Sequence, residues 1–155
     1  MRIFGIDPGS SITGYGVIDR DGRRLSHIDN GIIRPKVGSP YTARLGTIYD
    51  ALVKLLRQFA PNTVAIEEVF VAKNVHSALH LGQARGVAIL AATQAGCPVH
   101  EYPSRTVKQA IVGYGNATKE QIQVMTARLL GLPQTATTDA ADALAVAITH
   151  AHTAR

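Results

Sequence analysis

The stretch RIFGIDPGSSITGYGVIDRDG, residues 2–22, decides the fold of this 155-residue chain. Residues 2–7 are mostly apolar and end at Asp7-Pro8-Gly9, which is typical of a buried strand followed by a turn. Residues 14–20 and 24–34 are expected to form two further strands, because Asp21-Gly22 between them is a hairpin signal. The chain is therefore predicted to open with a three-stranded antiparallel meander.

The rest of the sequence alternates between helical and strand patterns. Residues 41–59 carry apolar side chains at helical spacing, and Pro61 follows them. Thr118 and Gln121 form a candidate capping box. Further strands are expected at 63–67 and 98–102, and further helices at 74–95, 104–112, 119–131 and 139–152. This order predicts an α/β fold, a single domain over 1–155, with a mixed five-stranded sheet (three antiparallel strands, then parallel strands) flanked by helices.

The charge balance points to a polyanionic partner. Sixteen Lys and Arg residues stand against eleven Asp and Glu, for a net charge of +5. In a small domain this favours nucleic acid, although a basic balance is also an ordinary solubility feature. Charge therefore raises the expectation of nucleic-acid binding without establishing it.

The single cysteine and the short apolar runs exclude several classes. Cys97 alone cannot build a disulfide framework or a zinc site, and a buried thiol in a reducing cytosol is expected. The longest unbroken apolar run, residues 87–92, is far below the roughly 20 residues that span a bilayer. We therefore expect a cytoplasmic protein that does not associate with membranes.

Two carboxylates stand at the ends of predicted strands. Asp7 ends the first strand and Glu67 the fourth, and sites form at the carboxyl ends of parallel strands. Neighbouring strands lie about 4.8 Å apart, so two such acids would repel unless a cation lay between them. Oxygen ligands suit Mg²⁺ or Mn²⁺. Glu68 is an alternative to Glu67, because adjacent strand residues face opposite ways and periodicity does not choose between them.

Two more acids open the last predicted helix. Asp139 and Asp142 are three residues apart, so they share one helix face, and the alanines between them permit close approach to the sheet. Together with Asp7 and Glu67 they could hold two metal ions about 3.5–4 Å apart for phosphodiester hydrolysis. Each acid also has an ordinary structural interpretation: Asp7 suits a turn, and acids are favourable at a helix start.

The helix expected at 74–95 has no polar face over part of its length. Residues 86–92 read GVAILAA, which indicates burial on more than one side. Small side chains would allow a partner to approach closely, namely Ala78, Gly82, Gly86 and Ala91. A homodimer formed through this helix is one hypothesis, and a central helix in a monomer is the other.

Five motifs occur in a fixed order along the chain: Gly5-Ile-Asp-Pro-Gly-Ser, Thr13-Gly-Tyr-Gly-Val, Ala65-Ile-Glu-Glu-Val-Phe, Leu81-Gly-Gln-Ala-Arg-Gly-Val and Asp139-Ala-Ala-Asp-Ala-Leu-Ala. The first motif alone is weak, because sugar kinases and chaperone ATPases begin similarly. The combined set resembles the RuvC family of bacterial Holliday junction resolvases over essentially the whole chain.

The resemblance implies a ribonuclease H-like fold and a homodimer that acts on four-way DNA junctions. It places the family's metal-holding acids on Asp7, Glu67, Asp139 and Asp142, and so favours Glu67 over Glu68. Some relatives carry a histidine where Asp139 stands, which makes its direct contact with the metal the least secure.

The resemblance also implies residues that contact DNA. The family's aromatic wedge falls on Phe70, for which core packing is the alternative, and its catalytic-region lysines fall on Lys108 and Lys119, for which solvated helix positions are the alternative. Arg85 and Arg105 are further candidates for phosphate contacts.

The implied activity is Mg²⁺-dependent cutting of Holliday junctions during homologous recombination and DNA repair. Two metal ions per subunit, replaceable by Mn²⁺, would drive paired symmetric nicks that leave 5′-phosphate and 3′-hydroxyl ends. The RuvA–RuvB branch-migration complex is the implied partner.

Three other functions are alternatives to this activity. An actin-like ATPase or sugar kinase would need two such domains. A catalytically silent junction-binding protein would have lost acids that are present here. A nuclease acting on RNA–DNA hybrids is the nearest enzyme alternative.

Overall fold

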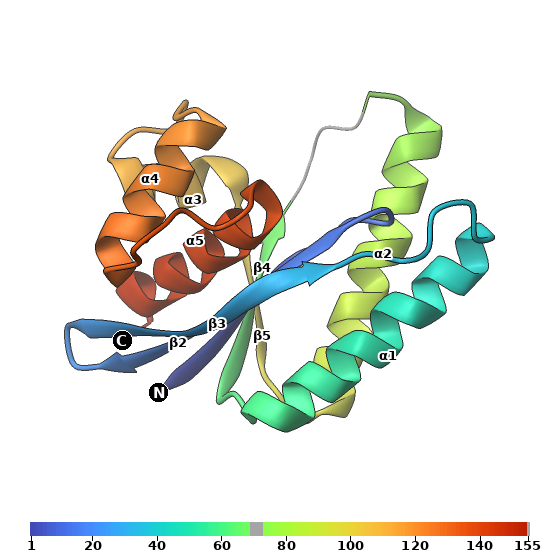
Figure 1. The fold of residues 1–155 in the computed structure, drawn as a ribbon, viewed down its shortest axis with the longest axis horizontal. Helices are drawn as coiled ribbons and strands as arrows, with labels where there is room; N and C mark the ends of the chain where they lie inside the picture. Colours follow the sequence, from blue (N-terminus) through green and yellow to red (C-terminus); the bar gives the residue numbers. More distant parts are fainter. Residues whose placement is uncertain (69–72, 155) are drawn as a thin grey trace.

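The computed structural model describes residues 1–68 and 73–154 (Figure 1). Five strands and five helices follow in the order β1 Arg2–Asp7, β2 Thr13–Asp21, β3 Arg24–Ile33, α1 Tyr41–Phe59, β4 Thr63–Glu68, α2 Val75–Gln94, β5 Val99–Pro103, α3 Ser104–Val112, α4 Lys119–Leu130 and α5 Thr138–Thr153. Every expected element is present. Phe70 lies outside the described residues.

The five strands form one mixed sheet in the order β3-β2-β1-β4-β5. β1 pairs with β2 and β2 with β3 in antiparallel fashion, whereas β4 lies parallel to β1 and β5 parallel to β4. This confirms the predicted mixed sheet, and the arrangement is ribonuclease H-like. Because β1 and β4 are parallel neighbours, their carboxyl ends meet at one edge.

Helices cover both faces of the sheet (Figure 1). Phe4 and Ile6 of β1 pack with α1 and α2 on one face, whereas Ile3 packs with α3, α4 and α5 on the other. The alternation follows from the period of two along a strand. Within the described ranges, no helix is both long and apolar enough to cross a membrane.

Helix ends follow from local sequence. Thr118 and Gln121 form the expected capping box, with Gln121 N donating to Thr118 Oγ1 at 3.2 Å and Thr118 N donating to Gln121 Oε1 at 2.8 Å. α4 ends at Leu130, one residue earlier than expected, because Gly131 adopts a left-handed conformation with φ of 64°.

Cys97 is buried, as expected.

Glycines on β1 and β2 let α5 lie directly against the sheet. Gly5 and Gly16 are cross-strand partners, and Gly14 pairs with Asp7. A Cβ atom on Gly5 would overlap the carbonyl oxygen of Ala143, and one on Gly14 would overlap that of Asp139. Glycine is therefore required here for close approach of two backbones. The first turn of α5 is consequently fixed beside the carboxyl end of β1.

We predict that Gly14→Ala destabilises the protein by roughly 1–3 kcal/mol, because the new methyl group must push the start of α5 away from β2. Urea unfolding measures the change. Gly46→Ala is the matched control, since Gly46 lies within α1 with open space around its Cα, and alanine there should stabilise by up to about 1 kcal/mol. Equal stability of the Gly14→Ala variant and the wild type would contradict the close-packing account.

Candidate active site

Asp7 and Glu67 project from the same face of the sheet. Ala65 of β4 belongs to the core beneath α5, whereas Ile66 belongs to the core beneath α1 and α2. Alternation along β4 therefore directs Glu67 toward the α5 face and Glu68 toward the other face. Asp7 shares its face with Gly5, which contacts α5. The pairing of Ile6 with Ile66 leaves Asp7 and Glu67 at neighbouring strand ends.

The start of α5 brings two more acids to this edge. Asp139 lies in its first turn, where its backbone packs on Gly14, the cross-strand partner of Asp7. Asp142 follows three residues later, on the same side of the helix. Both acids are partly buried. The local sequence Asp-Ala-Ala-Asp thus places carboxylates over the strand ends while its alanines fill the tight contact with the sheet.

A hollow of about 220 Å³ lies among these side chains. It is lined by three of the four predicted acids and both predicted lysines, together with three residues of α3 and α4: Asp7, Glu67, Asp142, Lys108, Lys119, Ser104, Val107 and Ile122. Asp139 does not line the hollow, but its charge acts on Asp7 and Asp142. Ser104 was not predicted, although its position directly after the parallel strand β5 is a recognisable signal.

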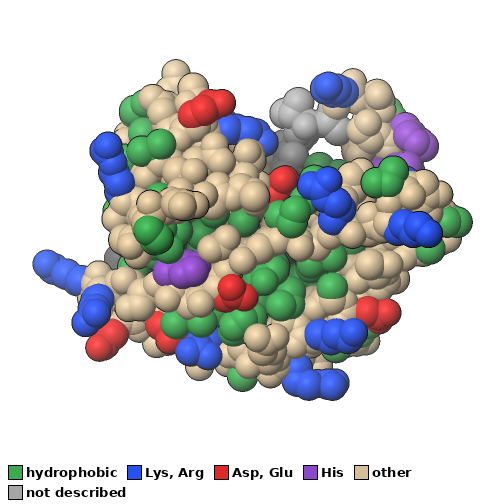
Figure 2. Space-filling model, in the orientation of Figure 1, with side chains coloured by type: hydrophobic (Ala, Val, Ile, Leu, Met, Phe, Trp, Pro, Cys, Tyr) green, Lys and Arg blue, Asp and Glu red, His purple; other side chains and the backbone are tan. Residues whose placement is uncertain are grey.

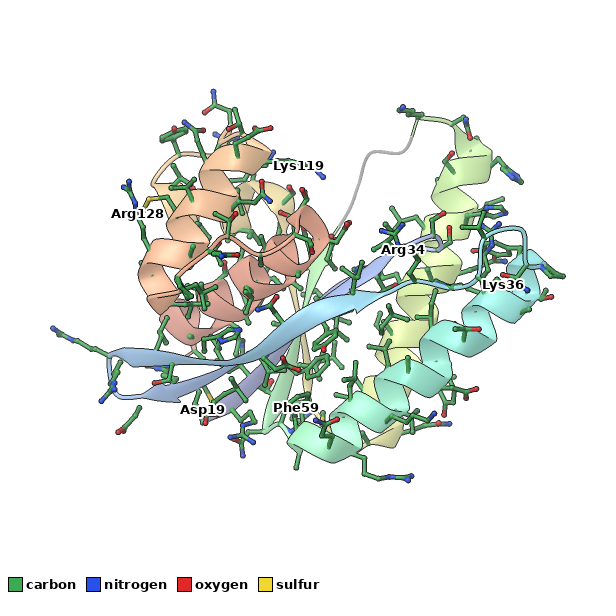
Figure 3. The ribbon with its side chains drawn as sticks, in the orientation of Figure 1. Asp19, Arg34, Lys36, Phe59, Lys119 and Arg128 are labelled. Carbon is green, nitrogen blue, oxygen red and sulfur yellow. The ribbon has the colours of Figure 1, made fainter. Side chains whose placement is uncertain are left out.

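Burial and neighbouring carboxylates raise the pKa of Asp7 and of Asp142. Burial raises the pKa of Asp7 well above its usual range, and the charges of Asp142, Glu67 and Asp139 add to the effect. Burial also raises the pKa of Asp142 to about 6, against the opposing charge of Lys119. Lys119 Nζ lies 3.7 Å from Asp142 Oδ2, and Figure 3 shows its side chain extending from the start of α4 toward this edge. The site is therefore rich in negative charge that Lys119 and Lys108 only partly balance.

This donor set fits divalent cations. Carboxylate oxygens are the ligands that Mg²⁺ and Mn²⁺ prefer, and a bound cation would offset both the burial and the repulsion that raise the pKa of Asp7. Within residues 1–68 and 73–154, no group of three or more acidic, histidine or cysteine side chains lies close enough together, as placed, to hold a metal ion. Asp7, Glu67 and Asp142 line the same hollow, so metal binding would require their side chains to move closer together.

The two arginines predicted to contact DNA lie outside the hollow. Arg85 lies on α2, where its Nη2 atom is 2.6 Å from Glu101 Oε1 of β5, so its guanidinium is paired within the protein. Arg105 lies on α3, is exposed, and rests its side-chain stem against Gly115. The structure thus gathers Lys108 and Lys119 around the hollow and leaves both arginines outside its lining.

A ribonuclease H-like sheet whose parallel strand ends carry a cluster of acids defines a metal-dependent nuclease. Residues 3–150 match the family model described as crossover junction endodeoxyribonuclease RuvC. The chain is 57% identical over 152 residues to the crossover junction endodeoxyribonuclease RuvC of Syntrophotalea carbinolica, covering 98% of this chain and 94% of that protein.

Two solved structures agree with this match. A Thermus thermophilus RuvC structure superposes with a TM-score of 0.87 at 35% identity, and T. thermophilus RuvC in complex with Holliday junction substrate with a TM-score of 0.91 at 36% identity. Each comparison covers 97% of this chain and 93% of the other. The chain belongs to the RuvC family of crossover junction endodeoxyribonucleases.

We predict that the apparent affinity for Mg²⁺ falls as the pH is lowered through about 6, because protons compete with the metal for Asp142. Lys119→Gln should move this fall to higher pH, since the Lys119 ammonium lowers the pKa of Asp142. Calorimetric Mg²⁺ titrations between pH 5 and 8 measure both effects. Lys54→Gln, an exposed change on α1, is the control. If the affinity for Mg²⁺ fell at the same pH in the Lys119→Gln and Lys54→Gln variants, the assignment of this fall to Asp142 would be contradicted.

Proposed function

We propose that this chain resolves four-way DNA junctions by paired nicks, as a metal-dependent phosphodiesterase. The observation that carries the proposal is the convergence of Asp7, Glu67 and Asp142 with two lysines on one hollow, in a chain of the RuvC family. One relative of known structure, from T. thermophilus, is described in complex with a Holliday junction substrate. The family relationship supports four-way junctions as the substrate class. The cluster of acids supports metal-dependent hydrolysis as the chemistry of the site.

The four acids divide into two groups by position. Asp7 and Glu67 come from the rigid sheet, whereas Asp139 and Asp142 come from α5. Together they would hold two Mg²⁺ ions, replaceable by Mn²⁺, which supply an activated water and stabilise the leaving oxygen of the phosphodiester. Cleavage that leaves 5′-phosphate and 3′-hydroxyl ends is the proposed outcome.

The lysines act on the phosphate. Lys108 and Lys119 approach the hollow from α3 and α4, on the side away from the strand ends of β2 and β3. Lys108 is half-buried and Lys119 is exposed apart from its contact with Asp142. Their ammonium groups would position the scissile phosphate and offset charge that develops on its oxygens. Arg85, Arg105 and the Phe70 wedge stay predictions for further contacts with DNA.

A second copy of the chain is the proposed partner at α2. Leu79 and Leu90 are 61% and 48% exposed, and Gly82 and Gly86 between them have open space at their Cα atoms. The four residues lie on one side of α2 at spacings of three to four. Ala91, which the sequence suggested as part of this side, is instead buried in the core against α1, because the helical period turns it inward.

A two-fold dimer explains paired cutting. Two identical subunits related by a two-fold axis would present two equivalent hollows to a substrate that is itself nearly two-fold symmetric. Symmetric nicks in opposed strands follow from this geometry. The cytoplasm is the proposed compartment and the RuvA–RuvB branch-migration complex the proposed partner in supplying junctions, both on the family relationship.

We predict that Asp7→Asn abolishes Mg²⁺-dependent cutting of a synthetic four-way junction, with a loss of at least about a hundredfold, because the site loses a carboxylate that holds the metal. Binding of the junction should persist, since the lysines remain. A gel assay with junction, linear duplex and RNA–DNA hybrid substrates measures cutting. Asp50→Asn, an exposed change on α1, is the matched control. Cutting by the Asp7→Asn variant at the wild-type rate would remove Asp7 from the site.

A further inference from the structure

Three cations meet beside the catalytic edge, on the side of the sheet away from Lys108 and Lys119. Arg34 follows the end of β3, Lys36 lies in the connection to α1, and Arg44 lies in the first turn of α1. Figure 3 labels Arg34 and Lys36 in this region. All three line a hollow of about 170 Å³ together with Ser11, Ile12, Pro35 and Val37.

These cations have no counter-charge within the described part of the chain. No carboxylate there lies within 4 Å of Arg34, Lys36 or Arg44. The one side-chain hydrogen bond among the three runs from Arg44 Nε to the carbonyl oxygen of Ser39, at 3.1 Å. This bond anchors the guanidinium and leaves its two Nη groups to meet a ligand. Like charges held together in this way favour an anion between them.

The connection that carries Lys36 is itself well defined. Ser39 N donates to the carbonyl oxygen of Lys36 at 3.1 Å, and Gly38 adopts a φ of 82° that closes the turn. The Arg44 side chain holds the same turn through Ser39. Lys36 therefore lies on a loop that these hydrogen bonds hold in place, close to the start of α1.

Strand register places this pocket near Asp7. Asp7 pairs with Gly14, and Gly14 pairs with Ile32, so two strand spacings of about 4.8 Å separate Asp7 from Ile32. Arg34 lies two residues beyond Ile32, about 7 Å farther along the strand direction. Ser11, on the pocket wall, is four residues from Asp7 and within about 14 Å of it. At 3.4 Å per base pair, this separation corresponds to about four base pairs of duplex.

The loop after β1 connects the two sites along the chain. Figure 2 shows Lys and Arg side chains to the right of centre, over the region between β3 and α1, next to an acidic side chain. The loop from Pro8 to Ile12 joins the strand that ends at Asp7 to the wall of the pocket. A phosphate backbone that reaches Asp7 can therefore continue across this loop to the three cations.

We propose that Arg34, Lys36 and Arg44 form a phosphate-binding pocket that holds the backbone of the DNA arm leading from the scissile strand. The inference rests on the proposed function and adds a contact outside the catalytic hollow. Lys108 and Lys119 approach the acids from α3 and α4, and this pocket flanks them from β3 and α1. Cations on both sides of the acids fix the direction of the arm. The pocket contributes to binding of the junction and not to the bond-breaking step.

The test compares two double variants in the Asp7→Asn background, where cutting does not interfere. Arg34→Gln with Lys36→Gln removes two exposed charges of the pocket. Arg23→Gln with Arg24→Gln removes two exposed charges at the β2–β3 hairpin, which lies at the opposite end of the sheet, and is matched in net charge. Fluorescence anisotropy measures the affinity for a four-way junction over a series of NaCl concentrations.

The pocket variant should lower the slope of log affinity against log salt by about 2 and weaken binding at least about tenfold near 0.1 M salt. The hairpin variant should have the same salt slope as the protein that carries Asp7→Asn alone. The effect should persist on a junction with arms of about eight base pairs, because the pocket lies about four base pairs from Asp7. In the background that retains Asp7, the pocket variant should lose more cutting activity at sub-saturating than at saturating protein concentration, which separates binding from chemistry.

Several results would overturn the proposal. One is a pocket variant whose salt slope equals that of the hairpin variant. Another is a change in salt slope that disappears on a junction with short arms, which would place the contact farther than about four base pairs from Asp7. A third is weaker binding of inorganic phosphate with unchanged binding of the junction, which would assign the pocket to a free anion. Failure of the Asp7→Asn protein to bind any junction is a different outcome, since it would overturn the proposed function itself.

Discussion

The direct packing of α5 on the glycines of β1 and β2 brings Asp139 and Asp142 to the strand ends that carry Asp7 and Glu67. A helix normally packs on a sheet across a layer of side chains that fills the space between them. Here Gly5, Gly14 and Gly16 remove that layer over the first turns of α5. The backbone oxygens of Asp139 and Ala143 occupy the space where Cβ atoms would otherwise be. Two acids of a helix therefore reach two acids of a sheet without long side chains.

Electrostatic repulsion between the acids opposes this packing. Apolar burial around Ile3, Leu144 and Ile148 favours the docked helix, whereas the acids that it gathers repel one another. Burial and this repulsion together raise the pKa of Asp7 and bring the pKa of Asp142 to about 6. Lys119 offsets part of the repulsion. A divalent cation held among the acids, as proposed, would offset more of it.

The sequence predicted the elements and their order because the relevant signals are local. The Asp21-Gly22 turn, the apolar period of residues 41–59 and the capping box at Thr118 each depend on a few neighbouring residues, and the structure contains each of them. Glu67 and Glu68 could not be separated in this way. Their facing depends on which side of β4 packs against α5, which is a property of the assembled sheet.

Other features of the site could be identified only from the three-dimensional structure. Ser104 carries no motif, and it enters the hollow because β5 is parallel to β4 and ends at the same edge. Ala91 fitted a stripe of small residues in sequence but is turned toward α1 in the fold. Arg34, Lys36 and Arg44 are spread over eleven residues, with no regular spacing to suggest a pocket. Phe70 lies outside the described residues, so its role stays a prediction.

Anomalous diffraction from crystals grown with Mn²⁺ tests the central claim most directly, because it locates the metal without reference to activity. The account predicts a peak between the ends of β1 and β4 and the start of α5, with carboxylate oxygens of Asp7 and Glu67 at coordination distances of about 2.0–2.3 Å. Loss of the peak in the Asp7→Asn variant should follow. Mn²⁺ bound only at other places, with no contact to Asp7, would contradict the account.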